Sequence, residues 1–203
     1  MDLWQYEKEA AAEGYAAVCG CDEAGAGPLA GPVYAAAVIL PLGEDIPGLD
    51  DSKKLTEKRR EALFPVIQER ALDWSAAFVS AEEIDKTDIL SARMRAMQLA
   101  IDGLSRKPDF ALVDGNRDHG RSAAITISHR CIVKGDSLSA SIAAASILAK
   151  VSRDRFMVEM AAKYPEYRFD RHKGYGTKLH YALLREYGPC PIHRRTFLKG
   201  MAP

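Results

Sequence analysis

Two adjacent carboxylates, Asp22 and Glu23, stand at the end of an apolar segment and are followed at once by a glycine-rich loop. Residues 15–21 predict a short buried strand, where an unpaired carboxylate carries a large desolvation cost. We therefore expect a cation beside the two acids, and a divalent metal ion is the leading candidate. The loop at 25–27 has little side-chain bulk, so a ligand can approach its backbone groups directly. A metal beside such a loop suggests a phosphodiester substrate.

Two further acids follow other predicted elements. Asp114 ends the apolar segment 110–113, and Asp136 stands just before an alanine-rich helix. Taken singly, a turn at Asp114 and a helix cap at Asp136 are the favoured interpretations. In an open α/β sheet, however, ligands gather outside the strand ends, so residues distant in sequence meet there. Four acids can hold two Mg²⁺ or Mn²⁺ ions, and a pair of ions about 3.5–4 Å apart can activate a water molecule and stabilise a leaving oxygen.

The hydrophobic pattern alternates between strands and helices along the chain. It predicts strands over 15–21, 33–40, 74–80, 110–113 and 125–127. It predicts helices over 56–71, 88–104, 139–163 and 177–187. A length of 203 residues with 47% hydrophobic content, no repeat and no convincing linker indicates a single mixed α/β domain.

The formal net charge of zero conceals an asymmetry. Residues 1–51 contain ten acids and one base, whereas residues 150–199 contain twelve bases and five acids. Solvated helix faces that pair with acids elsewhere would explain the basic segment. The histidines and Tyr175 interleaved with these bases favour a surface that contacts phosphates.

The first thirteen residues carry acids and Lys8 instead of a signal pattern, and no apolar run reaches the length of a membrane span. We therefore expect a cytoplasmic protein with no membrane association. Cys19 and Cys21 lie in a predicted buried strand, while Cys131 and Cys190 are far apart in sequence and show no Cys-x-x-Cys spacing. Reduced structural thiols are the favoured interpretation, with a zinc site or disulfides as alternatives.

Seven motifs occur in the order that resembles bacterial ribonuclease HII. They are Asp22-Glu23-Ala24-Gly25-Ala26-Gly27-Pro28, Asp51-Ser52-Lys53-Lys54-Leu55, Val113-Asp114-Gly115, Lys134-Gly135-Asp136, Ala143-Ala144-Ala145-Ser146, with its continuation Arg153-Asp154-Arg155, Lys173-Gly174-Tyr175-Gly176-Thr177 and Pro191-Ile192-His193-Arg194. The resemblance covers residues 15–197. It implies a ribonuclease H-like fold, with a mixed five-stranded sheet flanked by helices. It further implies one catalytic domain over 1–203, in which about 165–203 form a small helical substrate-binding part.

The resemblance also implies an activity and a set of site residues. The activity is metal-dependent cleavage of the RNA strand of RNA–DNA hybrids, including cleavage 5′ to a ribonucleotide embedded in duplex DNA, by two-metal hydrolysis that leaves 5′-phosphate and 3′-hydroxyl ends. The catalytic, metal-binding acids, which hold Mg²⁺ or Mn²⁺, would be Asp22, Glu23, Asp114 and Asp136. The nucleic-acid substrate is the expected partner, and the family usually acts as a monomer.

The implied substrate-binding residues are Gly25, Ala26, Gly27, Lys53 and Tyr175. The loop would read a 2′-hydroxyl through its backbone, which is how a protein distinguishes RNA from DNA. Tyr175 would stack on the next deoxyribose, and Lys53 would contact a phosphate. The family usually has Gly-Arg-Gly where this chain has Ala26 at the centre. Loss of that arginine predicts weaker substrate binding, because a charge-assisted hydrogen bond is worth about 1.5–3 kcal/mol. It also predicts a weaker preference for a single embedded ribonucleotide.

Other polar residues in the motifs receive structural interpretations. Asp154, with arginines on both sides, is expected to be ion-paired instead of binding metal. His172 and His193 receive no catalytic role, since a two-metal mechanism already activates the water. Three alternative functions remain: a nucleic-acid-binding module that no longer cuts, a nuclease of the ribonuclease HIII type, and a phosphate-binding metabolic enzyme. The four acids argue against the first, and the remaining motifs argue against the third. The second is disfavoured because that group usually has an additional N-terminal domain, which the 14 residues before the match are not expected to supply.

Overall fold

The computed structural model describes residues 2–115 and 124–200. At its centre is a mixed five-stranded sheet in the order β3-β2-β1-β4-β5. The strands are β1 (Val18–Ala24), β2 (Val33–Ile39), β3 (Asp73–Val79), β4 (Phe110–Asp114) and β5 (His129–Ile132). The predicted fold class, a mixed five-stranded sheet flanked by helices, is confirmed.

The register of the sheet brings two of the predicted acids together. β1 pairs antiparallel with β2 and parallel with β4, and β4 pairs parallel with β5. Cys21 in β1 lies opposite Val113 in β4, so the next residues, Asp22 and Asp114, emerge at the same edge of the sheet. Strand β1 extends through Ala24, so it includes the two acids instead of stopping before them as predicted.

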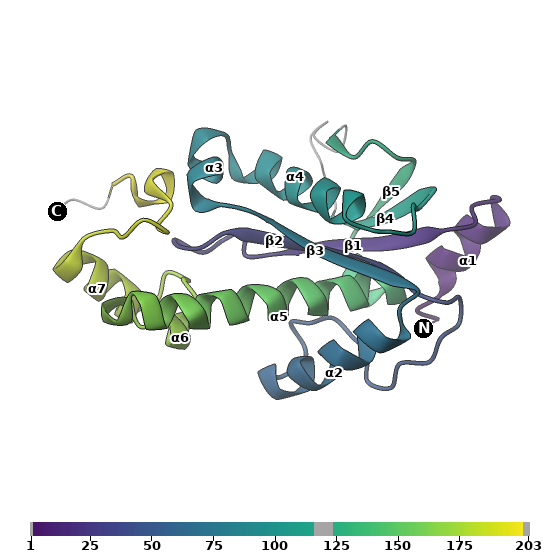
Figure 1. Ribbon diagram of the computed structural model, residues 1–203, viewed down its shortest axis with the longest axis horizontal. Coiled ribbons are helices and arrows are strands. Elements are labelled where there is room, and N and C mark those ends of the chain that lie inside the picture. The colour runs from purple at the N-terminus through teal and green to yellow at the C-terminus, as the bar shows by residue number, and fades with distance from the viewer. Residues whose placement is uncertain (1, 116–123, 201–203) are drawn as a thin grey trace.

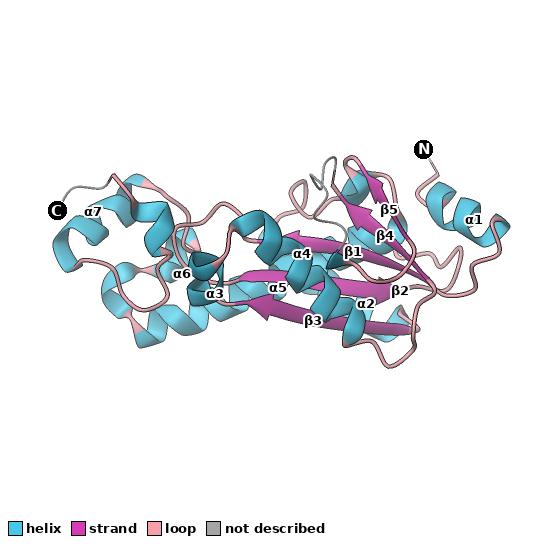
Figure 2. Ribbon diagram, turned by 90° about the horizontal axis from the view of Figure 1, so that it is seen from above, coloured by secondary structure: helices cyan, strands magenta, loops and turns pink. Residues whose placement is uncertain are grey.

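Helices cover both faces of the sheet. They are α1 (Gln5–Ala12), α2 (Glu57–Arg70), α3 (Ala81–Lys86), α4 (Ile89–Asp102), α5 (Ala140–Lys163), α6 (Phe169–His172) and α7 (Lys178–Tyr187). Helix α4 lies on one face, and α5 with α2 lies on the other, as Figure 1 and the two main clusters of buried side chains show. In Figure 2, seen from above, α4 lies over the strands. The sheet is therefore buried on both sides, as its apolar strands require.

The long helix α5 begins very close to the middle of β1. A Cβ atom added to Gly20 would lie 2.1 Å from the carbonyl carbon of Ser141, so only glycine allows this approach. Ser139 caps the helix by accepting a hydrogen bond from the N–H of Ile142. A short 3₁₀ helix, Gly135–Ser137, precedes it and carries Asp136. The close contact thus places Asp136 beside the strand ends.

The residues after α5 form a helical part at one end of the molecule, where α6 and α7 lie in Figure 1. They pack around a cluster that includes Met157, Tyr167, Phe169 and Leu184. Two 3₁₀ helices, Pro165–Tyr167 and Arg195–Leu198, complete this part. The helical character of the predicted substrate-binding part agrees with this arrangement, while its role and the single-domain assignment stay predictions.

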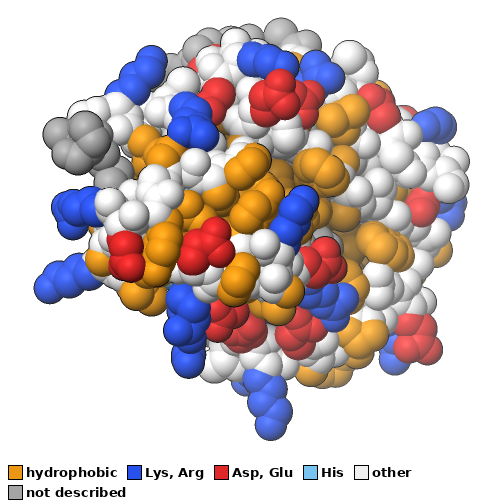
Figure 3. Space-filling model, turned by 60° about the vertical axis from the view of Figure 1, so that its left-hand side comes forward, with side chains coloured by type: hydrophobic (Ala, Val, Ile, Leu, Met, Phe, Trp, Pro, Cys, Tyr) orange, Lys and Arg blue, Asp and Glu red, His pale blue; other side chains and the backbone are white. Residues whose placement is uncertain are grey.

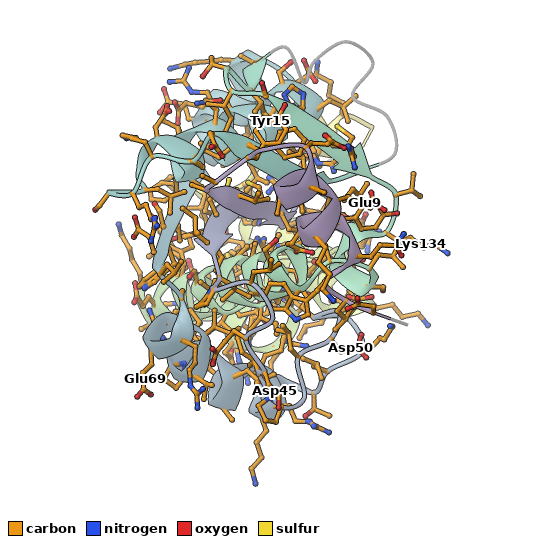
Figure 4. All side chains as sticks on the ribbon, turned by 90° about the vertical axis from the view of Figure 1, so that its right-hand side faces the viewer. Glu9, Tyr15, Asp45, Asp50, Glu69 and Lys134 are labelled. Carbon is orange, nitrogen blue, oxygen red and sulfur yellow. The ribbon has the colours of Figure 1, made fainter. Side chains whose placement is uncertain are left out.

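The opposite end of the molecule carries α1 and the loop between β2 and α2. Figure 4 views this end and labels Glu9, Asp45 and Asp50, three of the acids in the first 51 residues. The acidic N-terminal segment therefore contributes charge at the end away from α6 and α7.

The predicted strand over 125–127 is wrong, because the fifth strand is β5, His129–Ile132. Ile125 is buried and Ile127 packs against the core beneath α4, but their backbone joins no ladder. The N–H of Thr126 instead donates to the side chain of Gln98. The apolar residues here therefore reflect core coverage by a loop.

Helices α1, α3 and α6 were not predicted. Helix α3 has a clear local signal, since Ser80 and Glu83 form a capping box in which each side chain accepts a hydrogen bond from the other residue's backbone N–H. Thr56, Asp88 and Thr177, the first residues of three predicted helices, act as side-chain caps at the starts of α2, α4 and α7. The remaining strand and helix predictions agree with the structure to within a few residues.

Among the described residues, which include all four cysteines, no disulfide forms, and three of these cysteines are buried. No helix in the described part of the chain is both long and apolar enough to cross a membrane.

Candidate metal centre and substrate pocket

A pocket of about 240 Å³ opens at the ends of β1 and β4. Eight of the nine predicted site residues line it, namely Asp22, Glu23, Gly25, Ala26, Gly27, Lys53, Asp114 and Tyr175. The ninth, Asp136, contacts two of these residues directly. Residues from five separate stretches of the chain therefore meet in one place.

Three of the acids form a compact cluster. Carboxylate oxygens of Asp22, Asp114 and Asp136 all lie within 4.8 Å of one another. The N–H of Asp136 donates to Oδ1 of Asp114 over 3.4 Å, and the N–H of Glu23 donates to Oδ1 of Asp22 over 2.7 Å. Asp22 and Asp136 are only 4% and 3% exposed. This set of oxygen ligands fits Mg²⁺ or Mn²⁺, which prefer carboxylates to nitrogen or sulfur ligands.

The cluster concentrates negative charge in a buried place. Burial raises the pKa of Asp22 well above its usual value, and the charges of Glu23 and Asp114 raise it further. Burial likewise raises the pKa of Asp114, with the charge of Asp136 adding to the effect. A divalent cation would relieve both the desolvation and the repulsion.

Glu23 lies beside this cluster and pairs with an arginine that sequence analysis missed. Its Oε1 lies 2.6 Å from the guanidinium of Arg93 in α4. Its Oε2 is buried and has no hydrogen-bond partner among the described residues. Burial raises the pKa of Glu23 even though Arg93 opposes the shift. The unpartnered oxygen is a suitable additional metal ligand. Sequence analysis missed Arg93 because nothing in the amphipathic pattern of α4 distinguishes it from other polar residues.

Lys53 reaches the acids from the loop before α2. Its Nζ lies 2.7 Å from Oδ2 of Asp136, although the lysine side chain is 75% exposed. Partial burial lowers the pKa of Lys53, but the hydrogen bond to Asp136 and the surrounding acids outweigh it, so the net shift is upward. The preceding residue anchors the loop to α5 through a bond from the N–H of Ser52 to the hydroxyl of Ser146.

The glycine loop is held from behind by Arg194, which is fully buried. The guanidinium donates to the carbonyl oxygens of Gly25 at 2.6 Å and of Ala26 at 2.8 Å. Gly25 has φ +94°, a conformation that favours glycine. Within the described chain, the N–H groups of residues 25–27 donate to no protein acceptor. These N–H groups therefore remain available to a ligand in the pocket.

Tyr175 lies on a tight turn packed against the segment that follows this loop. Gly174 has φ +86°, and a Cβ atom added to it would lie 2.5 Å from the carbonyl oxygen of Ala30. The N–H of Leu29 donates to the carbonyl of Gly174 over 2.9 Å. The Tyr175 side chain is 40% exposed and faces the pocket. A base or sugar in the pocket can therefore reach both the loop and the ring.

The residues given structural interpretations lie outside the pocket. Asp154 is ion-paired, as predicted, with Lys150 at 2.7 Å and Arg60 at 3.8 Å, instead of with the arginines that flank it in sequence. His172 and His193 are buried in the C-terminal helical part.

The histidine network there has a defined direction. Nδ1 of His193 accepts a hydrogen bond from the N–H of Cys190, so its proton lies on Nε2, which donates to Nε2 of His180 over 2.9 Å. His180 then donates from Nδ1 to the carbonyl of Tyr175 over 2.9 Å. These neutral histidines support the tyrosine turn.

Comparison with known sequences settles the family. A family model described as Ribonuclease HII matches residues 19–199. The chain belongs to the ribonuclease HII family. Curated ribonucleases HII include that of Caldicellulosiruptor bescii, which is 50% identical over 98% of this chain and 95% of its own length. That of Dechloromonas aromatica is 56% identical over 89% and 90%. The chain is thus an endonuclease of the ribonuclease H type, the class that cuts the RNA strand of RNA–DNA hybrids.

Solved structures of the family agree. The ribonuclease H2 of Pyrococcus horikoshii superposes with a TM-score of 0.74 at 28% identity and covers 89% of this chain and 93% of its own. The ribonuclease HII of Archaeoglobus fulgidus, solved in a complex with PCNA, gives a TM-score of 0.74 at 26% identity, covering 88% and 94%. A ribonuclease HIII in complex with Mn²⁺ shares the fold, with a TM-score of 0.61 at 19% identity over 85% of this chain and 63% of its own.

Proposed function

We propose that this ribonuclease HII family member cuts 5′ to ribonucleotides embedded in duplex DNA as well as in RNA–DNA hybrids, leaving 5′-phosphate and 3′-hydroxyl ends. The observation that carries the proposal is a pocket that brings together clustered acids able to hold a metal ion, a backbone loop with available N–H groups and an exposed tyrosine. Its substrate partner is nucleic acid, and cytoplasmic location and a monomeric state remain predictions.

The acids Asp22, Glu23, Asp114 and Asp136 hold the metal in this proposal. The compact cluster of three and the unpartnered Oε2 of Glu23 support the assignment. Two bound Mg²⁺ or Mn²⁺ ions would supply activation of the attacking water and stabilisation of the leaving 3′ oxygen. Lys53, which neutralises Asp136 before metal binds, is free to turn toward a phosphate, because its side chain is largely exposed.

The loop and the tyrosine select the substrate in this proposal. A 2′-hydroxyl accepts from the N–H groups of Gly25–Gly27, whose neighbouring carbonyls are occupied by Arg194. The ring of Tyr175 packs on the following sugar, where a second 2′-hydroxyl would clash. Figure 3 shows the face toward the C-terminal helices, where Lys and Arg side chains, interspersed with Asp and Glu, lie around an apolar area. The basic side chains offer contacts for the duplex phosphates.

The direct test is a DNA duplex that contains one ribonucleotide, incubated with Mg²⁺, Mn²⁺ or EDTA. We expect a single nick 5′ to the ribonucleotide with either metal, none with EDTA and none in an all-DNA duplex. Asp22→Asn and Asp136→Asn should abolish the nick, whereas Asp45→Asn, at an exposed site on the far end, should not. A metal-independent nick, or one that persists in both active-site variants, would refute the proposal.

A further inference from the structure

Arg153, in the middle of α5, connects the two sides of the pocket. It is fully buried, and its guanidinium donates to three backbone carbonyl oxygens. Two of these belong to the segment after the glycine loop, Pro32 at 3.1 Å and Ala30 at 3.0 Å. The third, Lys173 at 3.0 Å, belongs to the turn that carries Tyr175. One side chain therefore holds both substrate-reading segments.

The same guanidinium also contacts the reading residues themselves. A Cβ atom added to Gly25 would lie 1.9 Å from Nε of Arg153, so the loop backbone rests directly on the arginine. The Cζ atom of Arg153 lies 5.7 Å from the centroid of the Tyr175 ring, within the range of a cation–π contact. A shift of Arg153 would therefore move the loop and the ring relative to each other.

The guanidinium of Arg153 binds backbone carbonyls instead of forming an ion pair. Within the described residues it forms no salt bridge, and the adjacent Asp154 pairs with Lys150 and Arg60. Three carbonyl acceptors compensate for the lost water. The three nitrogens of the planar guanidinium lie far enough apart to donate to carbonyls of two chain segments at once. Lysine, with one compact ammonium group, cannot reproduce this arrangement.

We propose that Arg153 is a positioning residue that fixes the spacing between the 25–27 loop and Tyr175, and thereby sets the preference for a ribonucleotide–deoxyribonucleotide junction over continuous RNA. The inference rests on the proposed function of these two segments. A junction has a 2′-hydroxyl at one nucleotide and none at the next. The 25–27 loop and Tyr175 must therefore contact these two successive nucleotides at the same time. Continuous RNA satisfies the loop alone, and its cleavage depends less on that spacing.

The test compares Arg153→Lys and Arg153→Met with the native enzyme. Steady-state kcat/KM is measured with Mg²⁺ on a duplex containing one ribonucleotide and on a duplex containing a run of ribonucleotides. We expect the ratio of the two values to fall by about 10- to 100-fold in Arg153→Lys, as for a misplaced binding group. Arg155→Met, two residues along α5 at an exposed position paired with Glu61, is the matched control and should keep the native ratio.

A purely structural role would lower both values of kcat/KM together and leave the ratio unchanged. That result, or a native ratio in folded Arg153→Lys, would overturn the proposal. Amide hydrogen exchange gives a second measurement, in which residues 25–27 and 174–176 should both exchange faster in Arg153→Lys, and native protection in both segments would also overturn it. A native enzyme with no preference for the junction would instead show that the proposed function of the two segments is wrong.

Discussion

Replacing Asp22 by asparagine should make the metal-free protein more stable while abolishing its activity. The carboxylate is 4% exposed and lies within 4.8 Å of oxygens from Asp114 and Asp136. Asparagine has the same shape, and its Oδ1 can still accept the 2.7 Å hydrogen bond from the N–H of Glu23. The substitution therefore removes charge with little change in packing.

The magnitude follows from Coulomb's law. At 4.8 Å and an effective dielectric constant of about 20, two unit charges repel by roughly 3.5 kcal/mol. The attraction between Asp22 and Lys53 is lost at the same time, and solvent in the pocket screens the acids. We therefore expect the free energy of unfolding to rise by about 1–3 kcal/mol, equivalent to roughly 3–9 °C in Tm for a chain of this size.

The pH dependence of stability independently checks that Asp22→Asn raises the free energy of unfolding. Because burial and neighbouring acids raise the pKa of Asp22 in the folded state above its usual 3.8, folded protein retains a proton that unfolded chain releases. The native protein therefore loses stability relative to Asp22→Asn as pH rises from about 4 toward neutrality. The difference between the two should be largest at neutral pH and small in acid.

The difference in unfolding free energy can be measured by urea denaturation in EDTA, monitored by circular dichroism at several pH values in this range. Asp45→Asn is the control. Added Mn²⁺ should stabilise the native protein and the control in proportion to metal occupancy, but stabilise Asp22→Asn much less. If Asp22→Asn unfolds at the same or a lower urea concentration than native protein at pH 7 in EDTA, the reasoning about stored repulsion is wrong.

Three other perturbations have definite expected outcomes. Ala26→Arg should lower KM for a duplex with one ribonucleotide by about tenfold or more, because it adds a charge-assisted contact to phosphate; unchanged kinetics on single and multiple ribonucleotides would contradict this. Burial lowers the pKa of His180 and His193 to about 4, so unfolded chain takes up protons below its value of 6.5 while folded protein does not. Stability to urea should therefore fall as pH decreases from about 6.5 to 4, and fall less in His193→Gln; identical slopes for the two proteins would rule out this histidine's contribution. Gly25→Ala should reduce kcat/KM at least tenfold, because the new methyl would meet a buried guanidinium and Gly25 has a positive φ. Gly27→Ala is the control, since its Cβ would meet open space. Equal activity of the two variants would count against a rigid loop.

The acidic centre could be predicted because its residues follow simple local rules. Carboxylates at strand ends and before a helix are visible in the sequence, and the resemblance to ribonuclease HII selects them from other acids. The sequence does not show the strand register that places Asp22 beside Asp114. It also does not show the short 3₁₀ helix that brings Asp136 to the same place. These depend on long-range pairing between β1, β4 and α5.

The arginine contacts show the limit more clearly. Arg93 and Glu23 are 70 residues apart, and only the packing of α4 on the sheet brings them within 2.6 Å. Arg153 and Arg194 occur in quoted motifs, yet their burial against backbone carbonyls has no periodic signature. The wrong strand over 125–127 has the same origin, since buried apolar residues in a loop resemble those of a strand.

The separation of charge along the molecule has a consequence for how substrate arrives. Acids such as Glu9, Asp45 and Asp50 lie at the end opposite α6 and α7, while the basic C-terminal segment lies toward the other end. A chain with no net charge therefore carries an electric dipole, and a polyanion approaching it experiences a torque before any contact forms. Association should be oriented and fast in dilute salt and should slow as the Debye length shrinks below the length of the molecule.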